Sequence, residues 1–470
     1  MVGKSSLIII LGFSIIFGVA GRYWNRTSNK ATQNLVGYYD TTMAHNIAVS
    51  AANIACDTVF SGGCKDTLSG SMPSGNFSGG NENTSSGSYA TSAVRLSYGG
   101  TDYLLATAVG NYNSMHGTIS DTVRILFQPS FFSGYAFFTQ NENNVNWITG
   151  DTVYGPFHTN GNMYITGSPV FYGRATWVGS PAKPNSSGSR PYFYGGWQQG
   201  AATYVQIPAD INGLASAPTA TRFTGSSSYT GSSYAYDVYL TFNSDGTVTE
   251  TDTTRGYAST HWHSSWSTVA STPSQNIPLS SIADPYGQVL IVVQDGDVHV
   301  SGTLKGNVTV AALQGSGSSR ISYTGKTEGT SYFGSSDGNV IIDGNMTHNS
   351  RTSDMLGLVA DNSVALNNQP TAGKVEIDGA IFARKGSFSY LGYATDHGST
   401  SNGTYNTFYG HLDVFGSITQ NLRGAVGQFG SYSGATGYLK NYRFDNRFYT
   451  KHPPYFPAAP NRFRIVSWGE

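Results

Sequence analysis

The sequence is poor in charge and in cysteine, and its first part has no proline. Only 11% of the 470 residues are charged and the net charge is −1, so nothing favours nucleic acid or an acidic substrate as a partner. No proline precedes Pro73, so nothing breaks a helix before that point. The 58 glycines, 31 tyrosines and 39% hydrophobic residues are instead typical of a folded, turn-rich, many-stranded protein rather than a disordered one.

Cysteine occurs only at Cys56 and Cys64. The residues between them include Gly62-Gly63, which can turn the chain back, so a disulfide Cys56–Cys64 closing a small loop is geometrically easy. Disulfides persist in oxidising compartments, so this pair indicates export. Two free thiols are the alternative. A metal site is not favoured, because His45 is the only obvious companion.

The first apolar run extends from Leu7 to Gly21 without a charge, between Lys4 and Arg22. From Lys4 to Arg22 a helix reaches roughly 27 Å, close to the ~30 Å hydrocarbon core of a bilayer. The apolar part also resembles that of a signal peptide, but no clear cleavage site follows. The large apolar side chains of the run are Leu7, Ile8, Ile9, Ile10, Leu11, Phe13, Ile15, Ile16, Phe17 and Val19.

The helical pattern continues beyond this run. Apolar residues recur every four positions, which predicts one unbroken helix over residues 1–60. They are Leu35, Tyr39, Met43, Ile47, Ala51 and Ala55, with Ala44, Ala48 and Ala52 beside them. The apolar third can be solvated by lipid or, in a polymer, buried against other copies, with Gly12, Gly18 and Gly21 allowing close helix approach. A plain signal anchor of a surface protein is the alternative.

Two signals conflict over the side of the membrane on which the body lies. Arg22, Arg26 and Lys30 follow the apolar run, and the positive-inside rule would therefore favour a cytoplasmic body. The cysteine pair and the Asn-, Ser- and Gly-rich composition favour the outside. We expect the body to lie outside.

Residues 61–130 are expected to form a small head. Ser-, Gly- and Asn-rich sequence to about residue 90 predicts an exposed loop. Alternating runs over 89–96, 102–109 and 117–127 then predict an antiparallel meander, with Gly99-Gly100 as a hairpin signal.

Residues 131–470 contain a repeat of the form Gly-x-φ-x-φ-x-Gly, in which φ is apolar. Short strands with apolar alternate residues and glycine corners favour a parallel β-solenoid, although two antiparallel sheets would also alternate. The copies begin at Gly161, Gly296, Gly338, Gly373 and Gly410, with lesser copies at Gly306 and Asn362. Residues 180–272 interrupt the repeat and are interpreted as a β insertion, including a hairpin of 234–242 with 247–251 across an Asp-Gly turn. The fold class is therefore α+β, mostly β.

Few residues suggest chemistry. Asp343 and Asp378 share one repeat position, and two aligned carboxylates could serve a polysaccharide-cleaving β-helix enzyme. Asp at a corner more often bonds its own backbone. The middle position is taken by His299, Glu376 and Asp413, which should point outward from the coil.

His261 and His263 have the spacing of a two-histidine metal site on a strand, but no third ligand is evident. A solvent-facing pair flanking a buried Trp262 is the plainer interpretation. We expect no metal, no cofactor and no enzymatic activity.

Scattered blocks of the sequence resemble large prepilin-like bacterial surface proteins whose body is a domain of unknown function. The blocks are residues 147–161, residues 165–173, Met43-Ala-His-Asn-Ile-Ala-Val-Ser-Ala-Ala-Asn-Ile-Ala55, and the end from Tyr442 through Pro453-Pro-Tyr-Phe-Pro457 to Trp468. The resemblance implies a type IV pilin-like architecture, in which the N-terminal helix packs in a filament core and the body is displayed outside. One departure is that no acidic residue precedes Asp40, where type IV pilins carry an early Glu.

The sequence therefore leads us to expect a structural subunit of a cell-surface filament, anchored in the inner membrane before assembly. Its partners would be copies of itself. The alternatives are a membrane-anchored adhesin or minor tip pilin, with a surface or carbohydrate ligand, and a β-helix enzyme acting on polysaccharide.

Overall fold

The computed structural model divides the chain into two compact units. Unit 1 contains Met1–Leu96, Asp102–Gln128 and Phe463–Glu470, and unit 2 contains Ser97–Thr101 and Pro129–Arg462. Strands account for 51% of the structure, so the chain is mostly β, as expected. The structure describes residues 3–61, 72, 74–78, 85–98, 101–115, 117–180, 188–200, 204–231, 233–259, 264–315, 337–367, 373–390, 408–430 and 434–469.

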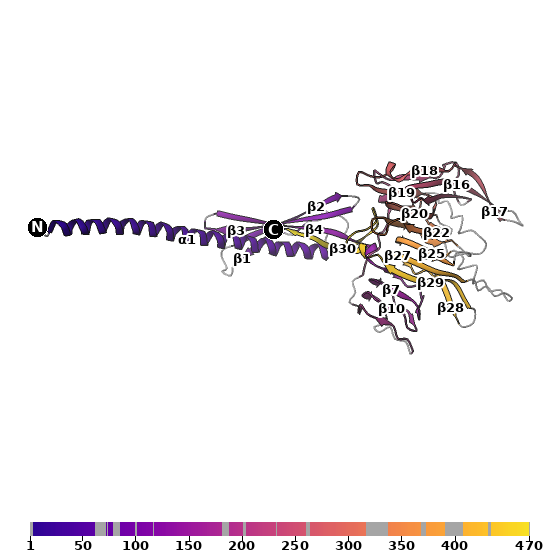
Figure 1. The fold of residues 1–470 in the computed structure, drawn as a ribbon, viewed down its shortest axis with the longest axis horizontal. Helices are drawn as coiled ribbons and strands as arrows, with labels where there is room; N and C mark the ends of the chain where they lie inside the picture. Colours follow the sequence, from indigo (N-terminus) through magenta and orange to yellow (C-terminus); the bar gives the residue numbers. More distant parts are fainter. Residues whose placement is uncertain are drawn as a thin grey trace. The chain divides into compact units, whose positions relative to one another are not determined.

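One helix, α1 (Gly3–Phe60), forms the first part of unit 1 and confirms the predicted unbroken helix (Figure 1). At 1.5 Å per residue, its 58 residues span about 87 Å. The helix ends where the proline-free sequence reaches Ser61-Gly-Gly. The amide of Ser61 still donates to the carbonyl of Asp57 at 2.7 Å.

The sheet of unit 1 has five strands in the order β1-β2-β3-β4-β30. Their bounds are Ser74–Ser78, Ser85–Tyr98, Thr101–Ser114, Gly117–Phe131 and Ala458–Gly469. The β1–β2 and β3–β4 pairs are antiparallel, as predicted for β3 and β4. Two features differ from expectation. Strand β1 and the start of β2 lie in the stretch expected to be a loop, and the last strand, β30, completes this sheet. Backbone bonding tolerates the small polar residues of β1, because the ladder uses main-chain groups.

The second half of α1 packs on this sheet through small side chains. Ala48, Ala51, Ala52 and Ala55 are fully buried, in one apolar cluster with residues of β3 and β4. Gly110 in β3 has no side chain because the helix backbone occupies that space. A Cβ there would lie 2.8 Å from the Cα of Ala48. The four-residue apolar spacing therefore produces a close helix–sheet contact in unit 1.

Unit 2 is built around three parallel ladders. The first runs through β14 (Thr221–Thr224), β19 (Gln288–Gln294), β21 (Asn307–Leu313), β23 (Met355–Ala360), the ends of β25 (Lys374–Ala383) and β27 (Phe408–Leu422), then β5 (Phe137–Asn141), β8 (Phe157–Thr159), β11 (Ala175–Trp177) and β13 (Trp197–Gln199). The second contains β15 (Tyr234–Phe242), β20 (Asp297–Leu304), β22 (Val340–His348), β24 (Val364–Leu366) and β26 (Phe388–Tyr390).

The third ladder runs from the end of β22 through the first halves of β25 and β27 to β29 (Gly434–Phe444), β7 (Thr152–Tyr154), β10 (Val170–Phe171) and β12 (Tyr192–Phe193). The first strands of unit 2 in sequence thus pair with the last, because Phe137 lies opposite Ile418 and Val153 opposite Tyr442. Figure 1 shows this succession down unit 2, from β19 through β27 and β29 to β7 and β10.

Most repeat motifs form strands as predicted. β20, β22 and β25 follow the glycines at 296, 338 and 373, and β27 contains the glycine at 410; the alternate Val, Ile and Leu residues of these motifs are buried. The copy at Gly161 differs, because only β9 (Ile165–Thr166) forms there, paired in parallel with β6 (Trp147–Ile148).

Buried hydrogen bonds connect the residues at the N-terminal ends of successive strands in the second ladder, from β20 to β26. Asn339 donates its amide to Asp297 Oδ1 at 2.9 Å and accepts the Ser363 N–H at 3.2 Å. Ser363 Oγ in turn accepts the Ser387 N–H at 3.1 Å. These bonds satisfy polar groups that would be costly to bury alone.

Part of the expected insertion joins the ladders instead of projecting from them. β12 to β15 are ladder strands, and only β16 (Thr247–Ser259), β17 (Ser264–Ser271) and β18 (Gln275–Pro278) form an antiparallel extension. The predicted hairpin is confirmed, with Phe242 opposite Val248. The first strand of the hairpin, β15, also pairs in parallel with β20, and the sequence pattern of the hairpin did not predict this second pairing.

Candidate functional site

The run from Leu7 to Gly21 in α1 presents a continuous exposed apolar surface. Every one of the ten large apolar residues predicted from the sequence is between 56% and 72% exposed. The exposed part continues through Trp24 and Leu35 to Tyr39, and Asp40 is the first buried residue. This helix is long and apolar enough to cross a membrane. In the part of the chain that the structure describes, the apolar surface on which the filament hypothesis depends is exposed.

Glycines increase the accessibility of this surface. The space beside Gly12, Gly18, Gly21 and Gly37 is open, with no heavy atom within 4 Å of a Cβ placed at any of them. The first three are the positions at which close approach of another helix was predicted.

The predicted disulfide is not tested by the structure. Cys56 is buried in the second half of α1, and no disulfide is seen among the described residues. Cys64 lies outside the described residues, so the pairing stays a prediction. The His261-Trp262-His263 motif also lies outside them.

The carboxylates considered for catalysis are not aligned with one another. In β22 and β25, Met346 lies opposite Ile377, so Asp378 is level with Thr347 rather than with Asp343. A register shift after Val300 moves Asp343 out of the repeat position. Arg351 binds Asp378 through two hydrogen bonds of 2.9 and 2.8 Å. The expectation of a shared carboxylate position is therefore wrong.

His299, which was predicted to point outward from the coil, is buried in the structure. Its residue is 4% exposed because Tyr239 of β15 stacks on the imidazole, with ring centroids 4.3 Å apart. Its Nδ1 lies 2.8 Å from Asp343 Oδ2. Tyr239 lies opposite His299 in the neighbouring parallel strand, a pairing that the two-residue alternation of one strand does not reveal. Glu376 and Asp413 are partly exposed, and Lys374 lies between them, 2.9 Å from Asp413.

Asp237 is a second acidic neighbour of His299 that sequence reasoning missed. Its side chain is fully buried, with Arg255 Nε at 3.5 Å and His299 Nε2 at 3.9 Å. Burial raises the pKa of Asp237 to about 7, against the opposing effect of His299. Burial lowers the pKa of His299, but the bond to Asp343 and the nearby carboxylates outweigh it, so this pKa lies above its usual value. Both groups hold protons more tightly in the folded state.

This cluster predicts a component of stability that falls as pH rises. The folded state binds more protons at Asp237 between its usual pKa of 3.8 and about 7, so the free energy of unfolding decreases across that window. The free energy of unfolding of Asp237→Asn, relative to that of the wild type, should therefore rise by about 4 kcal/mol between about pH 4 and pH 8. Urea titrations of both proteins across this range measure the difference.

The matched control is Asp245→Asn in the neighbouring hairpin turn. Asp245 is exposed, and its bonds with Thr247 lower its pKa, so its removal should give no such gain. Comparison with the wild type is needed because buried His158, whose pKa burial lowers to about 4, acts with the opposite sign. A constant difference between Asp237→Asn and wild type over the whole range would contradict the prediction.

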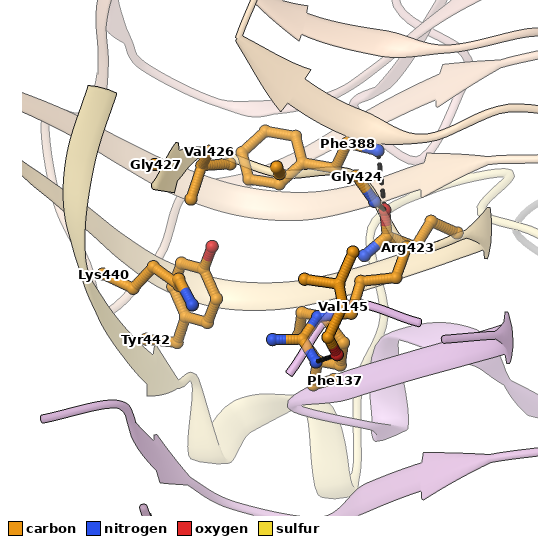
Figure 2. A pocket seen from close by; sticks show the side chains of 11 residues that line it. Phe137, Val145, Phe388, Arg423, Gly424, Val426, Gly427, Lys440 and Tyr442 are labelled. Atoms are coloured by element: carbon orange, nitrogen blue, oxygen red, sulfur yellow. Dashed lines mark hydrogen bonds between the residues drawn. The ribbon is translucent and has the colours of Figure 1, made fainter. Parts of the chain in front are cut away.

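A buried group of charges joins the first and last parts of unit 2, and Figure 2 shows its two cations, Arg423 and Lys440. Arg423, at the end of β27, donates to Glu142 Oε2 at 2.7 Å and to the carbonyl of Val145 at 2.8 Å. Its guanidinium carbon lies 3.8 Å from the centre of the Trp147 ring, whose Nε1 donates to Glu142 Oε2 at 3.0 Å. The side chains of Glu142 and Arg423 are 0% and 3% exposed.

Lys440 of β29 forms a second buried pair here, with Asp151, 2.8 Å away. A small pocket lies between this lysine, Arg423, Tyr442, Phe137 and residues 424–427, with space for about one water molecule. Figure 2 shows Lys440 lying alongside Tyr442. The group thus contains two basic and two acidic side chains, in the pairs Arg423–Glu142 and Lys440–Asp151. No pattern in the sequence predicted this group.

No metal centre is evident where the structure can be described. In that part of the chain, no three His, Cys, Asp or Glu side chains are placed to hold a metal ion.

Comparison of the chain with protein-family models, with curated proteins and with solved structures found no match.

Proposed function

We propose that the chain is the structural subunit of an extracellular filament of the type IV pilin-like kind. In this proposal the first half of α1 packs against other copies in the filament core. Unit 2 is a parallel β-solenoid with three-sided coils and is displayed outside. Before assembly the same helix lies in the inner membrane. The resemblance of the sequence blocks to prepilin-like surface proteins agrees with this role.

The observation that carries the proposal is the length of exposed helix. Residues 5–39 of α1 are almost entirely exposed, and these 35 residues span about 52 Å. A bilayer core of about 30 Å covers only some 20 of them. Leu35, Tyr38 and Tyr39 lie beyond that length and are 69%, 72% and 54% exposed. Packing of helices from several copies covers this remaining apolar surface, whereas a simple membrane anchor does not.

Support for the solenoid comes from the order of the parallel pairings. Each chain segment from β19 onward passes through the ladders in turn and pairs with the segment before it. Stacked parallel strands about 4.8 Å apart, with buried alternate residues, are the arrangement that a solenoid requires.

A membrane-anchored adhesin is the second candidate. Tyr23 and Trp24 directly follow the apolar run and are 72% and 78% exposed. Aromatic side chains at that position are typical of the membrane–water interface. The two candidates differ over whether residues 25–39 have a partner.

The test uses substitutions beyond the membrane-spanning length. Leu35→Glu together with Tyr38→Glu should leave the protein in membranes but abolish filaments, because burial of two carboxylates in the core is costly. Electron microscopy of surface preparations and membrane fractionation give the two readouts. Tyr286→Glu, at an exposed site in unit 2, is the matched control and should assemble normally. Wild-type protein found only as membrane-bound monomers would refute the proposal and support the adhesin.

A further inference from the structure

The Lys440–Asp151 pair is an amine and a carboxyl group held in contact away from solvent. Lys440 Nζ lies 2.8 Å from Asp151 Oδ2, and the two side chains are 9% and 7% exposed. Lys440 lies on β29 and Asp151 directly precedes β7, the neighbouring parallel strand, in which Val153 is opposite Tyr442. Asp151 Oδ2 also accepts the Ile148 N–H at 3.1 Å, which fixes the carboxylate. An amine and a carboxyl group are thus held in contact.

The surroundings favour the uncharged form of Lys440. Lys440 Nζ lies 5.6 Å from the ring centre of buried Trp147 and lines the same pocket as Tyr442 and Phe137. Burial lowers the pKa of Lys440, against the opposing effect of Asp151. An ion pair in such a site pays a large desolvation cost, and a proton passed along the hydrogen bond leaves an amine beside a carboxylic acid. A desolvated neutral lysine is a nucleophile.

We propose that Lys440 and Asp151 condense into an intramolecular amide bond. One proton moves from Lys440 Nζ to an Asp151 carboxylate oxygen, and the neutral amine attacks Asp151 Cγ. The N–C bond forms, one C–O bond breaks, and that oxygen leaves as water with a second proton from Nζ. No oxidant, reductant or other reactant is needed. Holding the two atoms in contact replaces a slow bimolecular encounter by an intramolecular step.

The bond would join residues 289 positions apart. It would link the first and last parts of unit 2 covalently, where β7 meets β29. A cross-link closing so long a loop removes much of the conformational freedom of the unfolded chain.

A second pair in the same unit isolates the effect of burial. Lys374 Nζ lies 2.9 Å from Asp413 Oδ2, again across neighbouring parallel strands, β25 and β27. These side chains are 49% and 28% exposed, so water keeps both groups charged. The proposal predicts an amide at Lys440 and none at Lys374.

Peptide mapping of the wild-type protein by mass spectrometry decides the matter. Trypsin should release residues 125–174 joined to residues 424–443, uncut after Lys440, with the mass of one water missing from their sum. Recovery of the two peptides separately, with cleavage after Lys440, would overturn the proposal and leave an ordinary ion pair. The wild-type map requires no variant and therefore stands even if a variant fails to fold.

Two variants sharpen the result. Lys440→Arg keeps the cation but should lose the joined peptide, whereas Lys374→Arg should retain it unchanged. Loss of the joined peptide in Lys374→Arg would show that the link depends on Lys374, and it would refute the assignment to Lys440.

Discussion

Arg423→Ala should destabilise unit 2 by about 3–5 kcal/mol, because it leaves the carboxylate of Glu142 buried without its cation. The truncation also removes the contact of the guanidinium with the Trp147 ring. Arg423 and Glu142 come from the last and first parts of unit 2. Loss of the bond between them therefore weakens the pairing of β27 with β5. Urea unfolding of the full chain in detergent micelles, followed by tryptophan fluorescence, measures the change in free energy.

Two further variants distinguish a buried charge from general damage. Lys374→Ala removes an exposed cation near Asp413 and Glu376 and should cost at most about 1 kcal/mol. Combining Arg423→Met with Glu142→Gln should recover much of the loss, because neither buried charge remains and Gln still accepts from Trp147. If the double variant is no more stable than Arg423→Ala, the uncompensated charge is not the cause.

Gly110→Val should disrupt unit 1, with a cost of about 3 kcal/mol or more. A Cβ at this position would lie 2.6 Å from the carbonyl oxygen of Ala44 and 2.8 Å from the Cα of Ala48. Both atoms belong to the helix backbone, so no side-chain rotation can relieve the clash. Resistance of the β3 region to proteolysis and the unfolding transition of unit 1 are the measurements.

Gly37→Ala is the matched control for this prediction. Gly37 lies in the same helix, with nothing within 4 Å of a Cβ placed there. Alanine should be neutral or stabilise the helix by up to about 1 kcal/mol, since glycine is the poorer helix former. Equal stability of Gly110→Val and wild type would show that α1 does not pack closely on β3.

The predictions that succeeded rest on local periodicity. The four-residue spacing from Leu35 to Ala55 specifies a helix, and the alternation after Gly296 and Gly373 specifies strands with buried Val and Ile. Both patterns act within one element, so a single sequence reveals them.

The features that were missed depend on partners distant in the sequence. Glu142 belongs to an Asn-rich stretch without an apolar pattern, yet it is buried and binds Arg423, 281 residues later. His299 is covered by Tyr239, and Asp343 is displaced by a register shift. Tertiary pairing decides such positions, and no local pattern records it.

The pairing of β5 with β27 implies a delay during synthesis between the appearance of β5 and that of its partner strand. Phe137 finds its partner only when Ile418 has been made, 281 residues later. At about 5–20 residues per second, that delay is roughly 15–55 s. During this interval the edge of β5 stays open to wrong partners, so a chaperone that binds the nascent chain would protect the protein until β27 has been made.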